Sequence, residues 1–443
     1  MRNPISQSKV PIEVLTFTSV SEVTPEGQSF FKGEIDRGEA FFEAQESAPM
    51  DPSSASVTAE NSTVQEFSTF VVTFKVPVPV EEGCIVTIQL PDEFKLSSGN
   101  LNRVKGWGIF GGSQELNFGI DESSRVIKIV NQCARYSGAD MSTGLEIHML
   151  QNPSVVMTTK SFTIYVQDKF TKGIAVVNAD VLYKTTPGKV VGVDLFSLGG
   201  TKIEELVDLR LNFTPQHAVS GVSALLIKLP DQVTFSCSLA YTIGLKTAPA
   251  CDQVGPNLFR FNRPFNGDDY AGNLPLSLAF RNRVLPGANL MIKGISIQML
   301  ATIDKTDYLV DEFVNPNLEF FAPEQQLFLI SQVSTGSEEV YTETTFTFNH
   351  TLANFVPRNA VIEVTIPPQI EVRNAEAVTS SCVAIKNLKD TLICTLQRHA
   401  DNSHVLTVRE AFHDLGLSRN KNFVLQIGKG LFTPLSMKTS DSF

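Results

Sequence analysis

The sequence predicts an all-β protein of tandem β-sandwich modules, each of about 138 residues, arranged as an extended rod. One pattern, an alternating apolar strand that stops at a proline, occurs three times and ends at Pro91, Pro230 and Pro367. The spacings are 230 − 91 = 139 and 367 − 230 = 137 residues. A second proline set has nearly the same period, with 187 − 49 = 138 and 323 − 187 = 136: Pro49, Pro187 and Pro323. This period is that of a whole domain and is too long for a solenoid repeat.

Each module contains short segments in which apolar and polar residues alternate, separated by turns rich in Gly, Pro, Asn and Asp. Strands are expected at 69–76, 85–90, 126–131, 145–150 and 161–167, then at 206–213, 224–229, 258–261, 275–280, 290–299 and 318–321, and last at 327–333, 344–349, 361–366, 391–396, 404–408 and 423–427. Such a series is typical of an antiparallel sandwich of immunoglobulin type. Strands and helices do not alternate, which argues against a parallel α/β fold. One helix is expected, at 408–417.

The proline periods divide the chain into four parts. Residues 1–48 are expected to be the closing strands of a partial module, 49–186 and 187–322 whole modules, and 323–443 a module that lacks its last strands. Pro153 begins the segment that closes the first module, and Pro4 and Pro434 occupy the same place in the repeat. The linkers are short and contain proline, which favours a semi-rigid rod: Ala48-Pro49, Thr186-Pro187-Gly188 and Ala322-Pro323.

Charge and composition limit the classes of partner. The formal net charge is −11 and the pI is near 5.2, which argues against nucleic acid and anionic membranes. The 31 Phe, against 7 Tyr and 1 Trp, suit sandwich cores better than carbohydrate-binding platforms. The sequence shows no transmembrane segment and no signal peptide, so a protein interpreted as extracellular is expected to be a fragment or a processed chain.

The six cysteines fall two to a module, as Cys84 and Cys133, Cys237 and Cys251, and Cys382 and Cys394. Pairing within each module is favoured because domains fold as units, although six cysteines allow fifteen connectivities. Buried free thiols are the alternative, since cysteine is often buried. Disulfides would place the protein in an oxidising compartment, extracellular or at the cell surface.

Three acceptor motifs for N-linked glycans fit the same location: Asn61-Ser-Thr, Asn212-Phe-Thr and Asn349-His-Thr. Two occupy equivalent places in their modules, since 230 − 212 = 18 and 367 − 349 = 18 residues separate them from the repeated proline. This coincidence favours a secreted array, although Pro215, directly after the second motif, would reduce its use.

No catalytic arrangement is found, so the protein is predicted not to be an enzyme and to need no cofactor and no metal. The sequence has neither a nucleophile elbow nor a nucleotide-binding glycine motif. The densest polar cluster is interpreted as a solvated loop and a short helix: His404, Glu410, His413 and Asp414. Two oxygen-rich segments, Asn266–Asp269 and Asp304–Asp307, lack the spacing of a calcium loop and are interpreted as turns.

The strand–proline–strand pattern, the two cysteines per module and the closing strand that follows Asn152-Pro153 carry a family resemblance. The chain resembles the tandem immunoglobulin-like modules of giant extracellular surface proteins, particularly those that coat the cells and cilia of protists. The resemblance covers nearly the whole chain and implies a structural or adhesive role without catalytic residues. Similar repeats also occur in microbial adhesins.

The leading hypothesis is therefore a structural building block of an extracellular filament or cell-surface coat. In its sharper form, residues 1–48 of one molecule supply the strands missing from residues 323–443 of the next, giving head-to-tail self-association. The plainer alternative is that the sequence is one stretch of a longer array. Two other classes stay open: a ligand-binding surface adhesin, with its site near an insertion-like stretch at 242–269, and a non-catalytic accessory array of a larger secreted enzyme.

Overall fold

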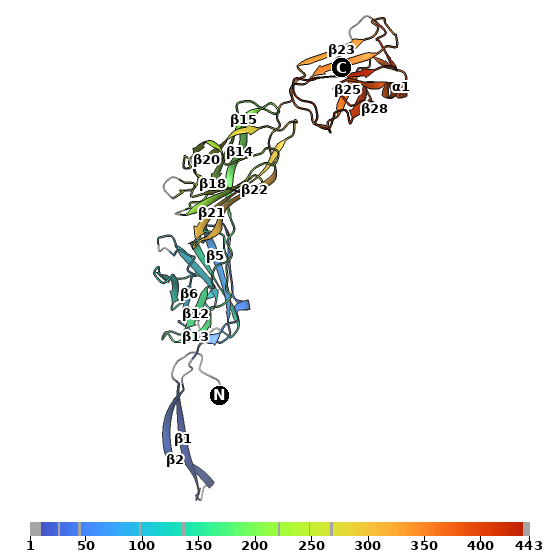
Figure 1. Cartoon of the computed structure of the whole chain (residues 1–443). Helices are drawn as coiled ribbons and strands as arrows, with labels where there is room; N and C mark the ends of the chain where they lie inside the picture. Colours follow the sequence, from blue (N-terminus) through green and yellow to red (C-terminus); the bar gives the residue numbers. More distant parts are fainter. Residues whose placement is uncertain are drawn as a thin grey trace.

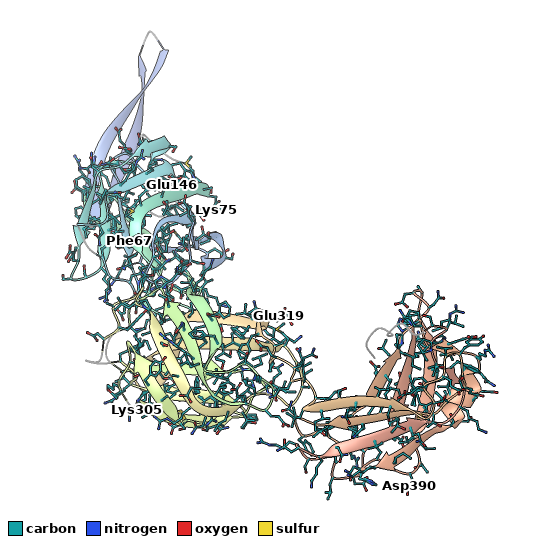
Figure 2. All side chains as sticks on the ribbon, turned by 90° about the horizontal axis from the view of Figure 1, so that it is seen from above. Phe67, Lys75, Glu146, Lys305, Glu319 and Asp390 are labelled. Atoms are coloured by element: carbon teal, nitrogen blue, oxygen red, sulfur yellow. A yellow bond between two sulfur atoms is a disulfide. The ribbon has the colours of Figure 1, made fainter. Side chains whose placement is uncertain are left out.

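The computed structural model describes residues 10–24, 27–42, 46–96, 99–134, 138–219, 222–247, 249–265 and 269–436. Figure 1 shows a long β-hairpin followed by three β-sandwiches, which we call the first, second and third modules. The first two modules follow each other roughly along one line, and the chain turns at the third (Figures 1 and 2). The prediction of an all-β, extended chain of sandwich modules is confirmed.

The hairpin consists of β1 (Val10–Thr24) and β2 (Gly27–Phe42), paired antiparallel along their whole length. Within the described residues these strands form a sheet of their own. An ion pair between Arg37 and Glu13 links them. A two-stranded sheet with no core beneath it is only marginally stable in water, so this element is suited to pack against something else.

The first module has two sheets, with strand orders β3-β13-β12-β6-β10-β9 and β4-β5-β11-β7-β8. A short 3-10 helix, Pro52–Ser54, follows β3. The strands are β3 (Ala48–Pro49), β4 (Ser56–Ala59), β5 (Phe67–Val76), β6 (Ile85–Gln89), β7 (Arg103–Gly108), β8 (Gly111–Glu115), β9 (Phe118–Asp121), β10 (Val126–Val130), β11 (Met141–Gln151), β12 (Thr163–Gln167) and β13 (Gly173–Val177).

In the second module a short parallel pairing of β14 with β22 joins the two sheets edge to edge, in the order β17-β20-β15-β14-β22-β21-β16-β19-β18. The strands are β14 (Gly188–Leu198), β15 (Leu206–Pro215), β16 (Ser223–Lys228), β17 (Leu239–Ile243), β18 (Ala250–Gly255), β19 (Leu258–Asn262), β20 (Leu276–Val284), β21 (Ile292–Ile303) and β22 (Thr306–Phe321).

The third module has smaller sheets, ordered β23-β24-β30-β27, β25-β29-β28 and β26-β31. Its elements are β23 (Ile330–Thr335), β24 (Phe346–Thr351), β25 (Ile362–Ile366), β26 (Glu371–Val372), α1 (Ala375–Ser380), β27 (Cys382–Lys386), β28 (Ile393–Arg398), β29 (His404–Arg409), β30 (Asn422–Ile427) and β31 (Leu431–Phe432). Whether the four predicted segments fold as independent units stays a prediction.

The repeated strand–proline pattern has the same role in each module. β6, β16 and β25 end just before the proline, which cannot donate to a strand ladder and therefore begins a turn. Three residues after each proline an apolar side chain is buried in the core of its module: Phe94, Val233 and Ile370. The pattern thus closes one strand and fixes the turn onto the core.

Buried phenylalanines fill the cores. In the first module Phe94 packs edge to face against Phe70 and Phe162, with ring centroids 5.5 and 5.3 Å apart. In the second, the rings of Phe235 and Phe280 lie 5.3 Å apart. Strands such as β5 and β15 alternate buried with less buried positions, so each strand turns one face to the core.

The helix expected at 408–417 is wrong. Its first residues belong to β29, where Val408 pairs with Ile362 of β25 and with Cys394 of β28. Because β29 forms backbone hydrogen bonds with a strand on each side, these residues adopt a strand despite their local helical pattern. The α-helix described in this module is α1, which is capped by Asn374, whose side chain accepts a hydrogen bond from the backbone N–H of Ala377. Within the described residues no helix has the length and apolarity needed to cross a membrane.

The described part of the stretch at 242–269 consists largely of sheet strands, and β18, at the edge of the sheet, is mostly exposed. Within it, β18 and β19 form a hairpin, and β19 pairs with β16, so the stretch extends a sheet of the sandwich. Of the predicted turn at 266–269, residues 266–268 lie outside the described residues.

Each module contains one disulfide: Cys84–Cys133, Cys237–Cys251 and Cys382–Cys394, with sequence separations of 49, 14 and 12. No cysteine among the described residues is free. Cross-links of this kind constrain the unfolded chain and typically contribute about 2–4 kcal/mol each. They fit an extracellular or cell-surface location, because the cytosol keeps thiols reduced.

Digestion under non-reducing conditions, followed by peptide mass mapping, is expected to yield three cross-linked peptide pairs, one from each module. Reduction should lower the free energy of unfolding of each module by roughly 2–5 kcal/mol, because the closed loops are released. Six free thiols in the native protein would contradict the disulfides and remove the argument for an extracellular location.

Candidate functional site: the junction between the first two modules

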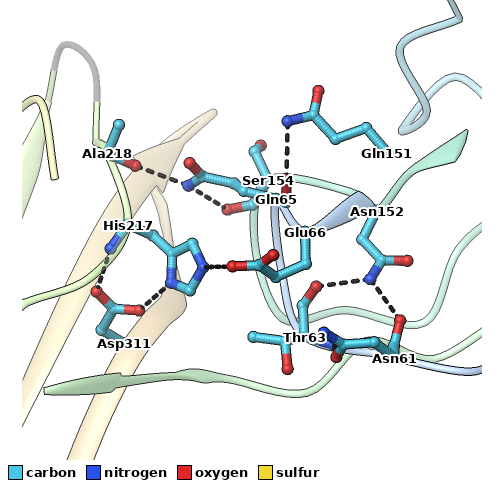
Figure 3. A network of polar contacts seen from close by, with 10 residues as sticks. All are labelled: Asn61, Thr63, Gln65, Glu66, Gln151, Asn152, Ser154, His217, Ala218 and Asp311. Carbon is cyan, nitrogen blue, oxygen red and sulfur yellow. Dashed lines mark hydrogen bonds and ion pairs between the residues drawn. The ribbon is translucent and has the colours of Figure 1, made fainter. Parts of the chain in front are cut away.

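The junction between the first and second modules is built from loops at one end of each sandwich (Figure 3). The first module contributes residues 60–66, between β4 and β5, and residues 152–157, which follow β11. The second contributes residues 216–219, after β15, and the strand β22. These segments are far apart in the sequence and meet only because each sandwich brings its loops to one end.

Two valines of the first module lie inside the core of the second. Val64 and Val155 come from first-module loops, yet they are buried in the hydrophobic cluster of the second module. Beside them, the backbone N–H of Val156 donates to the carbonyl of Leu309 over 2.8 Å. Burying a valine side chain stabilises by about 1.5–3 kcal/mol, so pulling the modules apart would expose both valines to water.

A buried histidine lies between two carboxylates from different modules (Figure 3). His217 Nδ1 is 2.6 Å from Asp311 Oδ1, and the backbone N–H of His217 donates to Asp311 Oδ2 over 2.8 Å. On the other side of the ring, Nε2 is 3.2 Å from Glu66 Oε1 of the first module. Asp311 is fully buried, while Glu66 lies toward solvent. The ring therefore connects a buried strand of its own module to the neighbouring module.

This arrangement favours the charged form of the ring. The hydrogen bond to Asp311 raises the pKa of His217, burial opposes it, and the charge of Asp311 and the contact with Glu66 raise it further. An imidazolium donates from both ring nitrogens, whereas the neutral ring donates from one. Protonated His217 can therefore bond both carboxylates at once, and the neutral ring must give up one of them.

Gly188, in the linker, makes room for this group. A Cβ atom at this position would lie 2.1 Å from Asp311 Oδ1 and 2.1 Å from His217 Nδ1. Gly188 also pairs with Asp311 in the parallel bridge between β14 and β22. The linker glycine is thus required for close approach, because any side chain would displace the buried pair.

Side-chain amides form a second set of contacts across the junction. Gln65, held in a left-handed backbone conformation with φ 60°, donates from Nε2 to the carbonyl of Ala218 over 2.7 Å. Gln151 supports it by donating to the Gln65 carbonyl over 2.8 Å. Asn152 donates to the carbonyls of Asn61 and Thr63 and so fixes the loop that carries Val64.

An open depression of about 450 Å³ lies beside these amides. Its walls come from both modules and combine polar groups, such as Glu93 and Lys95, with the ring of Tyr270. The Tyr270 hydroxyl lies 2.8 Å from the carbonyl oxygen of Pro215 and 2.7 Å from that of Leu274, and it accepts a hydrogen bond from the N–H of Leu274. Burial raises the pKa of this hydroxyl to about 12, so it stays protonated.

The junction between the second and third modules is built differently. Backbone hydrogen bonds link Glu324 to Thr201 and Ile203, and the N–H of Phe355 donates to the Glu204 carboxylate over 3.1 Å. The buried cluster of the third module, as far as the structure describes it, contains no side chain from the second. Hydrogen bonds at the surface, rather than a shared core, therefore connect these two modules.

The predicted glycan acceptors occupy two kinds of place. Asn61 is exposed, at the edge of the first junction, and its Oδ1 accepts from the N–H of Thr63. Asn212 lies within β15 and Asn349 within β24, both half-buried, and their Oδ1 atoms accept from Ser277 and Asn422. Glycosylation at all three positions stays a prediction.

The other polar candidates are not brought together as a site. No group of three or more His, Cys, Asp or Glu side chains suited to a metal occurs among the described residues. His404 lies in β29, where burial lowers its pKa, while His413 is exposed in the following loop. Residues 304–305 form the β21–β22 turn, and Asp307 lies at the start of β22, where an ion pair with Arg260 at 2.6 Å lowers the pKa of its carboxyl.

Sequence reasoning missed the role of His217. It stands 151 residues from Glu66 and 94 from Asp311, and no spacing motif joins them. One local signal exists: Gly188 directly follows the linker proline, and glycine at such a place often marks a close approach.

No protein-family model matches the chain, and no curated protein matches it. Similar solved structures include the type II cohesin dyad of the ScaA scaffoldin of Acetivibrio cellulolyticus (9% identity, 58% of this chain, 89% of that chain, TM-score 0.17). Another is the MSCRAMM ACE of Enterococcus faecalis, with 10% identity over 61% of this chain and 96% of that chain and a TM-score of 0.18. A third is the fimbrial adhesin FimA of Actinomyces, with 9% identity over 59% of this chain and 100% of that chain and a TM-score of 0.18. At these TM-scores the likeness carries no argument about what this chain does. The resemblance to protist coat proteins stays a prediction.

Replacing His217 by Gln is expected to flatten the pH dependence of stability. Because the pKa of His217 is raised in the folded state, its contribution is fully present below about pH 6.5 and is lost as the pH rises through the raised value. Thermal unfolding between pH 6 and 9 should show the second module losing stability in the native chain and less so in H217Q. The exposed-loop variant H413Q is the control, and an unchanged slope in H217Q would refute this role.

Gly188→Ala is expected to destabilise the second module by about 2–4 kcal/mol, because the added methyl group displaces a buried, hydrogen-bonded ion pair. The matched control is Gly112→Ala, since a Cβ at Gly112 meets nothing within 4 Å. Denaturant unfolding measures both variants. Equal midpoints for the two would show that the junction tolerates a side chain.

Proposed function

We propose that the chain is a force-transmitting building block of an extracellular filament or cell-surface coat. The first junction is the observation that carries the proposal. Two valines of one module lie in the core of the next, and His217 bonds carboxylates of both modules. Modules joined only to bring binding sites near one another need just a flexible linker, whereas a shared core resists bending and extension.

The placement outside the cell is supported by the three disulfides and by the exposed acceptor at Asn61. The proposal keeps the predicted division into mechanical units, with residues 49–186, 187–322 and 323–443 as sandwich units and 1–48 as a closing element. In this proposal the chains form a filament by self-association. The filament or coat would lie on a cell or a cilium, as the sequence resemblance implies.

A surface adhesin is the second candidate, and the depression beside Tyr270 favours it. A ligand there would contact both modules and would depend on their fixed alignment. Saturable binding on a glycan or protein array, lost when the exposed Lys95 of the depression is replaced by Ala but kept in Lys75→Ala on β5, would favour an adhesin. An accessory role in a secreted enzyme has no comparable observation behind it.

Pulling single molecules by their ends is expected to give separate force peaks for the sandwiches. Reduction of the disulfides should lengthen the unfolding steps by about 170 Å for the first module, about 50 Å for the second and about 40 Å for the third. These values follow from separations of 49, 14 and 12 residues at roughly 3.5 Å per extended residue. A chain that extends without force peaks would contradict a mechanical role.

A further inference from the structure

The strand before the repeated proline has two neighbours in the first two modules and one in the third. β6 lies between β10 and β12, and β16 lies between β19 and β21. The equivalent strand β25 pairs with β29, and no other strand of the described residues lies on its second side. An open edge presents unpaired backbone groups to which another strand can add.

Burial at equivalent positions reflects this difference. Six residues before the proline, Ile85 is 4% exposed and Ala224 0%, whereas Val361 is 48% exposed. One residue later, Val86 and Leu225 are fully buried, but Ile362 is only half-buried. The third module therefore has an apolar edge at the place that the first two modules cover with their own hairpins, β12–β13 and β21–β22.

The N-terminal hairpin has the dimensions of such a closing hairpin. β21 and β22 have 12 and 16 residues, and β1 and β2 have 15 and 16. Two residues connect the strands in each pair, at 304–305 and at 25–26. β21 starts six residues after Pro286, and β1 starts six residues after Pro4. The second strand of each pair ends in two phenylalanines.

At the open end of the hairpin, one face carries apolar residues on both strands. Ile12 and Val14 of β1 share a face and pair with Ala40 and Gly38 of β2, and Val14 is exposed. The opposite face carries the ion-paired Glu13 and Arg37 and also Glu39, together with the apolar Leu15 and Phe41. Along these residues the two faces therefore differ in charge, and the uncharged face is the one suited to cover a sheet.

We propose that the β1–β2 hairpin of a second copy of this chain adds to the open edge of β25, with β1 antiparallel to β25 and the Ile12–Val14 face over the third core. The orientation follows β12 on β6 and β21 on β16. Donor and acceptor lie at opposite ends of the rod (Figure 1), so the contact does not close on itself and propagates head to tail. This inference rests on the proposed filament and names its joint.

The test uses full-length chains that carry a lysine on one side of the joint. Val361→Lys places a charge on the acceptor edge, and Val14→Lys places one on the donor face; both side chains are exposed in the free chain, so folding should be unaffected. Matched controls are Ile393→Lys, on β28 at the other edge of the same sheet, and Phe41→Lys, on the opposite face of the hairpin. Circular dichroism verifies the fold, and Val361→Glu replaces V361K if that variant unfolds.

Light scattering over a concentration series should show growing oligomers for the native chain, I393K and F41K, and at least tenfold weaker association for V361K and V14K. Mixing V361K with V14K should then give 1:1 dimers that do not grow, because one intact donor meets one intact acceptor. A native chain that stays monomeric, V361K that assembles like the native chain, or a mixture that stays monomeric would each overturn the proposal.

The same samples separate this joint from the proposed function. Small-angle scattering of monomeric V361K reports whether a single chain is an extended, stiff rod. A rod that does not assemble would reject the joint and leave the force-transmitting role standing. A chain whose modules move freely about the first junction would reject the role itself, whatever the state of association.

Discussion

The first two modules depend on one arrangement: the strand before the repeated proline, β6 or β16, is paired on both sides. In the second module the hairpin that completes this arrangement does more than close a sheet. β21 pairs with β16, while β22 reaches β14 and carries Asp311, the buried partner of His217. Closing the sandwich and attaching it to its neighbour therefore use the same strand. A substitution that disrupts β22 would therefore destabilise the core of the second module and also break its contacts with the first module.

The junction combines two kinds of interaction with different dependence on conditions. Burial of Val64 and Val155 does not depend on pH, whereas the bonds of His217 to Asp311 and Glu66 do. In addition, Glu66 lies toward solvent, so its contact is screened by salt, while the buried Asp311 contact is screened much less. Raising pH or ionic strength should thus loosen the polar contacts first and leave the two valines to hold the alignment.

Much of the fold follows from the sequence because strands have a period of two, which a single chain displays directly. The repeated prolines predict where β6, β16 and β25 end. The apolar residues that follow these prolines are buried, as the alternating pattern implies. The site does not follow in this way. Val64 and Val155 look like any loop valines, and only the docking of two sandwiches decides whose core they enter. The helix expected at 408–417 failed for a similar reason, because β25 and β28 hold Val408 in a strand.

The first junction is expected to be stiffer than the second, because it buries apolar side chains and the second is held by hydrogen bonds. Each valine buried at the first junction contributes about 1.5–3 kcal/mol, and separating the modules by any angle loses that burial. At the second junction the contacts are hydrogen bonds such as Phe355 to Glu204 and Gln326 to Ile203. Bonds of this kind contribute about 0.5–1.5 kcal/mol each and are replaced by bonds to water when broken. Bending therefore costs little at the third module, which is where the chain turns in Figure 1. A filament of such chains would consist of stiff pairs of modules alternating with compliant joints, so it could bend under flow without exposing any core.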